Sequence, residues 1–110
     1  MQKNKIPKVL IIAGSDSGGG AGIQADIKAV TYFKGYAMTA ITAVTSQNTK
    51  GVQAIFPLPT DHIESQINSV LEDLTPNIIK TGMLADIDLI EMIASRVGEY
   101  KLVIDPVMVA

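Results

Sequence analysis

An uninterrupted apolar run at residues 9–13 lies between Pro7 and Gly14 and restricts the fold of this chain more than any other feature. Its length and its flanking residues are typical of a strand that is buried on both faces. Such strands occur in sheets that helices cover on both sides. A hydrophobic content of 47%, with 18% charged residues, fits a sheet of this kind. The run therefore predicts the buried strand of an α/β domain.

Apolar patterns along the rest of the chain alternate between strand and helix. The first helix is predicted to follow Gly22 and to end with Gly35 as its C′ residue. The second helix is predicted to start at an N-cap, Asp61, with Glu64 completing a capping box. The third helix is predicted at residues 86–97, and strands are predicted at 9–13, 38–44, 52–58, 77–81 and 101–105. Strands that alternate with amphipathic helices imply one α/β domain with a mostly parallel sheet.

The bulk properties exclude several classes of function. The net charge is −2 with acids and bases interspersed, which gives no indication of a nucleic acid or an anionic membrane as partner. The chain has no cysteine, so disulfides, thiolate metal sites and a cysteine nucleophile are excluded. No apolar run approaches the length of a membrane span or a signal-peptide core. A cytoplasmic protein with a small-molecule ligand is predicted.

The glycine-rich loop at residues 14–22, with the sequence GSDSGGGAG, connects the first strand to the first helix. A helix N-terminus carries N–H groups without intrahelical partners and a positive dipole end, so this loop is expected to attract phosphate or another polarised oxygen. It also follows the carboxyl end of a strand, where α/β sheets bind ligands. The alternative is an exposed turn without a ligand.

Two known phosphate-binding patterns do not account for this loop. A Walker loop needs a lysine before its helix, and no lysine occurs between Lys8 and Lys28. The dinucleotide pattern G-x-G-x-x-G/A matches residues 20–25, but no acidic residue lies between Asp26 and Asp61 to bind a ribose. Neither pattern identifies the ligand.

Other polar or soft side chains follow the predicted strands. Gln47 offers donors and an acceptor suited to the edge of a heterocycle, or it caps a loop. Met83 either forms an apolar wall or belongs to the core. Three roles are open for Asp105: to hold a metal through water, to orient a phosphate, or to cap a following helix. His62 is expected at the surface, and no serine–histidine–acid set is present.

Four stretches in a fixed order resemble hydroxymethylpyrimidine/phosphomethylpyrimidine kinases, which belong to the ribokinase-like superfamily and act in thiamine biosynthesis. They are AGSDSGGGAGIQAD at 13–26, ITAVTSQNT with GVQ at 41–53, KTGML at 80–84 and DPVMVA at 105–110. Pyridoxal kinases are similar in fold and more distant in these motifs. The resemblance implies a three-layer ribokinase-like fold.

The resemblance also implies roles for single residues. Asp26 corresponds to an acid near the substrate, and Asp105 to a residue beside the phosphate that would hold Mg²⁺ through water. Contacts with the pyrimidine substrate are implied for Gly14, Gln47, Met83 and Val107. The implied cofactors are ATP and Mg²⁺, and the full-length protein is expected to be a homodimer. ATP binds mainly to the C-terminal half of family members, so residues 1–110 are expected to be the N-terminal, substrate-binding portion of one kinase domain, without the catalytic residue.

The expected function is ATP-dependent phosphorylation of 4-amino-5-hydroxymethyl-2-methylpyrimidine, or of its monophosphate to the diphosphate. The alternatives are a pyridoxal or pyridoxine kinase, a ligand-binding module without catalysis, and a truncated gene product. Gln47 and the triple glycine favour the pyrimidine. Family members are well over twice this length, and the last strand would leave an uncovered edge. Residues 1–110 alone are therefore expected to be inactive and poorly soluble.

Overall fold

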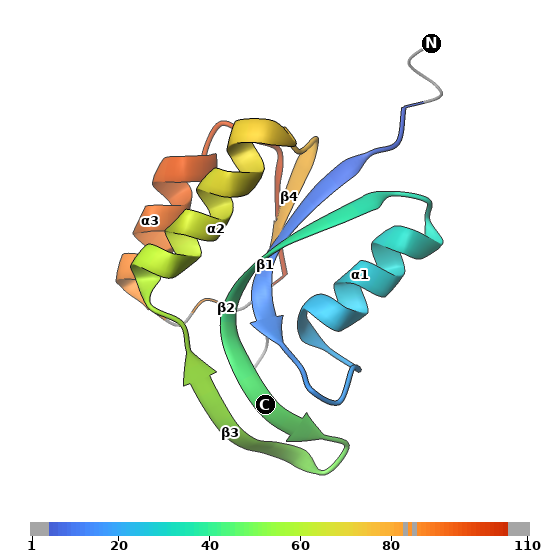
Figure 1. The fold of residues 1–110 in the computed structure, drawn as a ribbon, viewed down its shortest axis with the longest axis vertical. Helices are drawn as coiled ribbons and strands as arrows, with labels where there is room; N and C mark the ends of the chain where they lie inside the picture. The colour runs from blue at the N-terminus through green and yellow to red at the C-terminus, as the bar shows by residue number, and fades with distance from the viewer. Residues whose placement is uncertain (1–4, 83, 85, 106–110) are drawn as a thin grey trace.

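The sheet is built around β1, which has a parallel neighbour on each side. In a computed structural model, its order is β3-β2-β1-β4-β5, and three of its four strand pairings are parallel (Figure 1). β3 alone runs antiparallel, next to β2. The strands are β1 (Lys8–Ser15), β2 (Tyr36–Asn48), β3 (Gly51–Pro57), β4 (Ile78–Thr81) and β5 (Leu102–Ile104). The expectation of a mostly parallel sheet is confirmed. The structure describes residues 5–82, 84 and 86–105.

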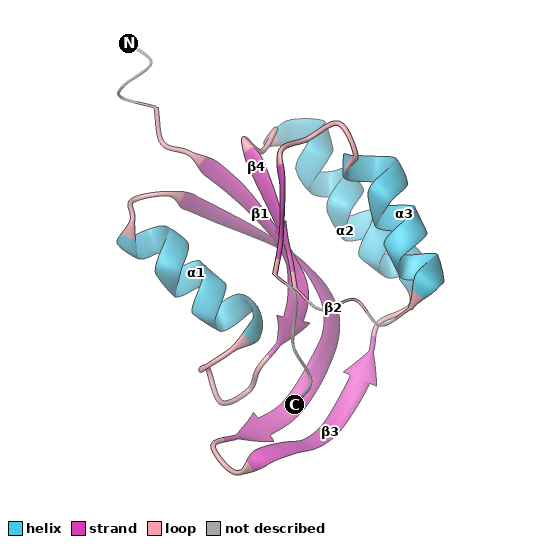
Figure 2. Ribbon diagram, turned by 180° about the vertical axis from the view of Figure 1, so that it is seen from behind, coloured by secondary structure: helices cyan, strands magenta, loops and turns pink. Residues whose placement is uncertain are grey.

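Helices cover both faces of this sheet. α1 (Gly22–Tyr32) lies on one face, while α2 (Thr60–Asp73) and α3 (Ile87–Val97) lie side by side on the other (Figure 2). Side chains of β1 alternate between the two layers, because successive residues of a strand point to opposite faces. Leu10 and Ile12 pack under α2 and α3, whereas Ile11 packs under α1. The run at residues 9–13 is thus the strand buried on both faces that its sequence predicts.

The end of α1 differs from the prediction. Gly35 is not the C′ residue, because Lys34 has the positive φ of 67° that this position requires. The Lys34 N–H donates to the Thr31 carbonyl at 2.9 Å, and the Gly35 N–H donates to the Val30 carbonyl at 2.8 Å. This is the Schellman pattern with its glycine displaced by one residue. A Cβ on Gly35 would lie 2.8 Å from Val30 Cγ1, so close packing requires this glycine.

The predicted N-cap of the second helix is also wrong. α2 begins at Thr60 with Pro59 as its N-cap residue, and Asp61 lies in the first turn. Glu64 does not complete a capping box and instead pairs with Arg96 of α3. The prediction for α3 is more accurate, since Asp86 caps this helix and accepts the Asp88 N–H at 2.9 Å.

β2 continues beyond the predicted end at Val44, because its last residues pair with β3. The two strands form a hairpin that extends past the helical layers (Figures 1 and 2). Every residue of β3 is exposed, including the large apolar side chains of Ile55 and Phe56. Polar residues expected in a loop after β2 therefore lie on a strand, at the edge where the ligand site is expected.

Candidate functional site

The candidate site lies where the parallel strands end. β1 leads into the glycine-rich loop, Gln47 lies near the end of β2, Gly82 follows β4 and Asp105 follows β5. Because β1, β2, β4 and β5 are parallel, these residues share one edge of the sheet. This edge is where open α/β sheets bind ligands.

The carboxylate of Asp16 organises the glycine-rich loop. Its Oδ1 accepts the Gly18 N–H at 2.8 Å, and its Oδ2 accepts the N–H groups of Gly20 and Ala21 at 3.0 and 2.8 Å. The Gly19 N–H donates to the Asp16 carbonyl at 3.0 Å. Asp16 is only 6% exposed. The expectation that the loop offers free N–H groups to phosphate is therefore wrong for Gly18, Gly20 and Ala21.

Two glycines of the loop differ in what the fold requires of them. Gly22 has φ of +60°, and a Cβ there would overlap the Gly14 carbonyl oxygen. At Gly14 the backbone has no positive φ, and a Cβ would lie 3.5 Å from the Ala43 carbonyl oxygen, an ordinary van der Waals contact. The conformation of the chain therefore requires glycine at 22 but not at 14.

The loop is joined to β2 through Ser17 and Thr45. Ser17 Oγ donates to the Gln47 carbonyl and accepts the Gln47 N–H, both at 2.7 Å. Thr45 Oγ1 lies 2.8 Å from the Ser15 carbonyl oxygen and 3.1 Å from Gln47 Oε1. These contacts fix the predicted ligand residue Gln47 beside the loop, so the structure brings Gly14 and Gln47 to the same edge.

Lys80 brings the two predicted acidic residues together. It lies on β4, and its ammonium group forms an ion pair with Asp26 of α1. The Asp105 carboxylate, after β5, lies 3.6 Å from the same nitrogen. Side-chain exposure is 17% for Asp26, 26% for Lys80 and 57% for Asp105, so only Asp105 is widely open to solvent.

These carboxylates do not form a metal cage by themselves. The described part of the chain contains no group of three or more His, Cys, Asp or Glu side chains placed to hold an ion. The Lys80 ammonium group also competes with a cation for Asp105. Contact through a water molecule, as predicted for Asp105, needs only one exposed carboxylate and is compatible with this arrangement.

Two predicted ligand residues, Met83 and Val107, lie outside the described residues. Sequence reasoning also missed two residues. Asp16 has a signal, since aspartate followed by glycine two residues later is typical of a side chain that bonds the backbone of its own turn. Lys80 has none, because its partners are distant in sequence and meet only in the folded sheet.

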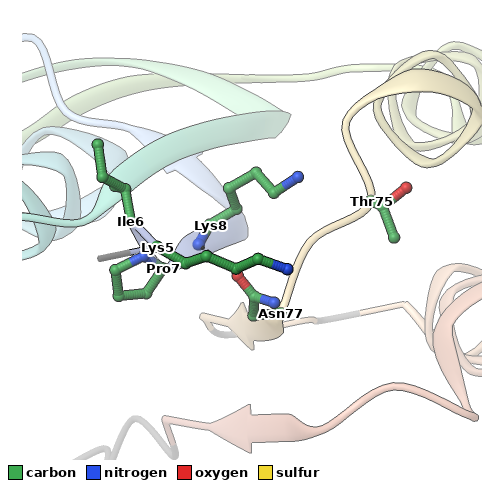
Figure 3. Close-up of a pocket in the computed structure, with 6 residues that line it drawn as sticks. All are labelled: Lys5, Ile6, Pro7, Lys8, Thr75 and Asn77. Carbon is green, nitrogen blue, oxygen red and sulfur yellow. Dashed lines mark hydrogen bonds between the residues drawn. The ribbon is translucent and has the colours of Figure 1, made fainter. Parts of the chain in front are cut away.

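A concave region lies at the end of β1 opposite to the candidate site. The Asn77 side chain accepts the Lys8 N–H there at 2.8 Å. The region is lined by Lys5, Ile6, Pro7, Lys8, Thr75 and Asn77 (Figure 3). It adjoins the start of β1, whereas the glycine-rich loop follows the end of the strand, so it is not part of the candidate site.

Comparison with known proteins identifies the family. The sequence profile of phosphomethylpyrimidine kinase matches residues 16–110. The chain belongs to this family. Its alignment with the hydroxymethylpyrimidine/phosphomethylpyrimidine kinase of Bacillus subtilis is 53% identical over 108 residues, covering 96% of this chain and 40% of the relative. The ordered motifs found in the sequence thus identified the family correctly.

Solved structures confirm the ribokinase-like kinase fold. Phosphomethylpyrimidine kinase from Clostridium difficile superposes with a TM-score of 0.87 at 46% identity, covering 96% of this chain and 47% of that structure. An ADP complex of Bacillus subtilis pyridoxal kinase gives a TM-score of 0.85 at 42% identity, with 96% and 41% coverage. The chain spans about 40% of the length of the curated kinase that it matches. None of the described helices is both long and apolar enough to cross a membrane.

Proposed function

We propose that this chain binds the phosphoryl acceptor in an enzyme that phosphorylates 4-amino-5-hydroxymethyl-2-methylpyrimidine or its monophosphate. ATP is the phosphoryl donor, the diphosphate is the final product, and the pathway is thiamine biosynthesis. In this proposal residues 1–110 are the N-terminal, substrate-binding portion of one kinase domain. The ATP site and the catalytic residue lie in the part of the family's length that these residues do not span. The protein is proposed to be cytoplasmic and homodimeric.

The observation that carries the proposal is the attachment of Gln47 to the glycine-rich loop. Ser17 Oγ donates to the Gln47 carbonyl and accepts the Gln47 N–H, and both hydrogen bonds are 2.7 Å long. A Cβ on Gly14 would make only an ordinary contact with the Ala43 carbonyl oxygen, so the fold itself does not need glycine there. In this proposal a flat ring packs over Gly14, and the amide group of Gln47 pairs with the donor and acceptor edge of an aminopyrimidine.

The remaining predicted residues would complete this site. Asp26, held by Lys80, would orient a polar substituent of the substrate. Met83 and Val107 would contact the ring, although they lie outside the described residues. Asp105 would hold Mg²⁺ through water, and bound Mg²⁺ neutralises charge on the transferring phosphoryl group. Positioning the acceptor hydroxyl is this portion's main contribution, because phosphoryl transfer depends chiefly on positioning and charge stabilisation.

The test is ADP release by the purified protein in its full encoded length. We expect release with the pyrimidine alcohol and with its monophosphate, and a lower kcat/KM with pyridoxal. Gln47→Ala should raise KM for the pyrimidine. Gln53→Ala is the matched control in the same hairpin, because among the described residues the Gln53 side chain bonds only Asn48 and Gly51, which flank the turn. A folded protein that binds ATP and releases no ADP with either pyrimidine would overturn the proposal. Preferential turnover of pyridoxal would indicate a pyridoxal kinase instead.

A further inference from the structure

Asp16 supplies the glycine-rich loop with an anion from within the chain. We propose that Asp16 determines what the acceptor site accepts: its carboxylate occupies the loop amides, so the loop receives an uncharged ring and excludes phosphate. The inference rests on the proposed function and extends it by assigning a specificity-determining role to a residue that the motif alone does not single out.

The geometry of the loop is that of an occupied anion site. Four consecutive N–H groups, from Gly18 to Ala21, donate to Asp16, three of them to its carboxylate and one to its carbonyl. Convergent backbone amides before a helix are the usual receptor of a phosphate oxygen. A carboxylate fixed in the same chain has a large entropic advantage over any anion from solution. External phosphate therefore has no comparable set of donors within these residues.

Asp16 is also held in place at its backbone. Its N–H donates to Gln24 Oε1 at 2.8 Å, and Gln24 Nε2 donates to Ser15 Oγ at 2.8 Å. These bonds tie the residue to α1, and Asp16 is buried, with an exposure of 6%. The carboxylate therefore stays in the loop when a ligand arrives.

Charge around the loop disfavours phosphate as well. A phosphate against the loop would lie within a few ångströms of the Asp16 carboxylate, where like charges repel strongly. The Lys28 ammonium group donates to the Gly19 carbonyl at 2.9 Å. The substrate's ring therefore faces the loop, and any phosphate that it carries points away from it.

The experiment removes the internal anion and asks whether external anions replace it. Asp16→Ala leaves space for formate beside three N–H donors, and Asp16→Asn removes the charge at nearly constant volume. The control is Asp86→Ala, which also deletes a carboxylate that accepts a backbone N–H, but at the exposed start of α3. Thermal midpoints of the full-length proteins are compared in formate, inorganic phosphate and chloride at equal ionic strength.

We expect formate and phosphate to raise the midpoint of Asp16→Ala relative to chloride by more than they raise the midpoints of wild type and Asp86→Ala, whose response reports only the general salt effect. In kinetics, both Asp16 variants should raise KM for the pyrimidine about tenfold or more. Inorganic phosphate should compete with the pyrimidine in the variants and not in wild type. Equal anion responses in all proteins, or wild-type KM in both variants, would overturn the inference.

Two further outcomes keep this inference separate from the proposed function. If wild type releases no ADP with any substrate, the proposed function fails, and the anion response of Asp16→Ala still tests the role of the carboxylate. If both variants fail to fold, the inference is tested on the wild-type protein by NMR. Titration with inorganic phosphate must leave the amide resonances of Gly18, Gly20 and Ala21 unshifted, and saturable shifts there would contradict an occupied site.

Discussion

Lys80 of β4 and Asp26 of α1 form an ion pair that connects the sheet to the helix on its face. The two residues are far apart in sequence, and Asp105 after β5 approaches the same ammonium group at 3.6 Å. One cation therefore links three elements at the edge of the sheet that carries the candidate site. Because Asp26 is only 17% exposed, water cannot fully replace Lys80 as its partner.

The variant Lys80→Met keeps the unbranched side chain up to the position of Cε and removes the charged ammonium group. We expect the free energy of unfolding to fall by about 1–3 kcal/mol, because partial exposure of the pair lowers the cost below that of a fully buried one. Urea denaturation measures the change. In an Asp26→Asn background the same substitution should cost less, since the carboxylate is already neutral.

Arg96→Met is the matched control for this prediction. Arg96 pairs with Glu64 between α3 and α2, and both side chains are more exposed than Asp26. Its loss should cost no more than about 1 kcal/mol. Equal losses for the two variants would show that the position of Lys80 between two carboxylates has no special effect on stability.

A second prediction concerns Gln66 of α2, whose side chain makes hydrogen bonds to the backbone of β2 that a neighbouring strand would otherwise make. Its Oε1 accepts the Ile41 N–H at 2.8 Å, and its Nε2 donates to the Ile41 carbonyl at 2.9 Å. The pairing of β2 with β3 ends at Ala43, so it does not reach Ile41. Gln66→Ala should lower the free energy of unfolding by about 1–3 kcal/mol, because two backbone groups lose their partner.

Amide exchange at Ile41 provides a local measurement of the same loss and should accelerate in Gln66→Ala. Asn68→Ala removes another amide from the same helix and serves as the control, since the Asn68 side chain has no hydrogen bond among the described residues. Unchanged exchange at Ile41 would contradict the proposed role of Gln66.

A third prediction tests the connection between the glycine-rich loop and β2. Ser17→Ala removes both bonds to the Gln47 backbone and should lower stability by about 1–2 kcal/mol. Exchange of the Gln47 amide should accelerate, and under the proposed function KM for the pyrimidine should rise. Ser46→Ala, which changes an exposed serine next to Gln47 on β2, should change none of these three quantities. Equal effects of the two variants would rule out a specific role for Ser17.

The layers and the parallel sheet could be predicted because burial on both faces leaves a clear pattern. The apolar run at residues 9–13 is bounded by proline and lysine on one side and by glycine and serine on the other. A run this short and this apolar is typical of a strand that is covered on both faces. The antiparallel pairing of β3 was not predictable in the same way. All seven of its residues are exposed, so apolar periodicity carries no information about its neighbour.

The position of the glycine-rich loop between β1 and α1 was predicted, but its interactions were not. The glycine motif located the loop, whereas the occupation of its amides depends on where one side chain, Asp16, folds back. Gly35 illustrates a similar limit at the end of α1. Sequence alone suggests a backbone role for this glycine, and only the packed structure shows that contact with Val30 requires it.

The last prediction separates a glycine that the fold needs from one that the ligand needs. Gly22→Ala places a Cβ against the Gly14 carbonyl oxygen at a φ of +60°, so stability should fall by about 2 kcal/mol or more. Gly14→Ala meets only an ordinary contact with Ala43 and should change stability by less than about 1 kcal/mol.

For substrate binding, Gly14→Ala should have the large effect that it lacks on stability. Under the proposed function the methyl group of Gly14→Ala occupies space needed by the pyrimidine ring, so KM should rise about tenfold or more while the protein stays folded. Urea denaturation and steady-state kinetics on the same full-length preparations measure both effects. A Gly14→Ala protein as unstable as Gly22→Ala, or one with wild-type KM, would show that Gly14 is not the open side of the acceptor site.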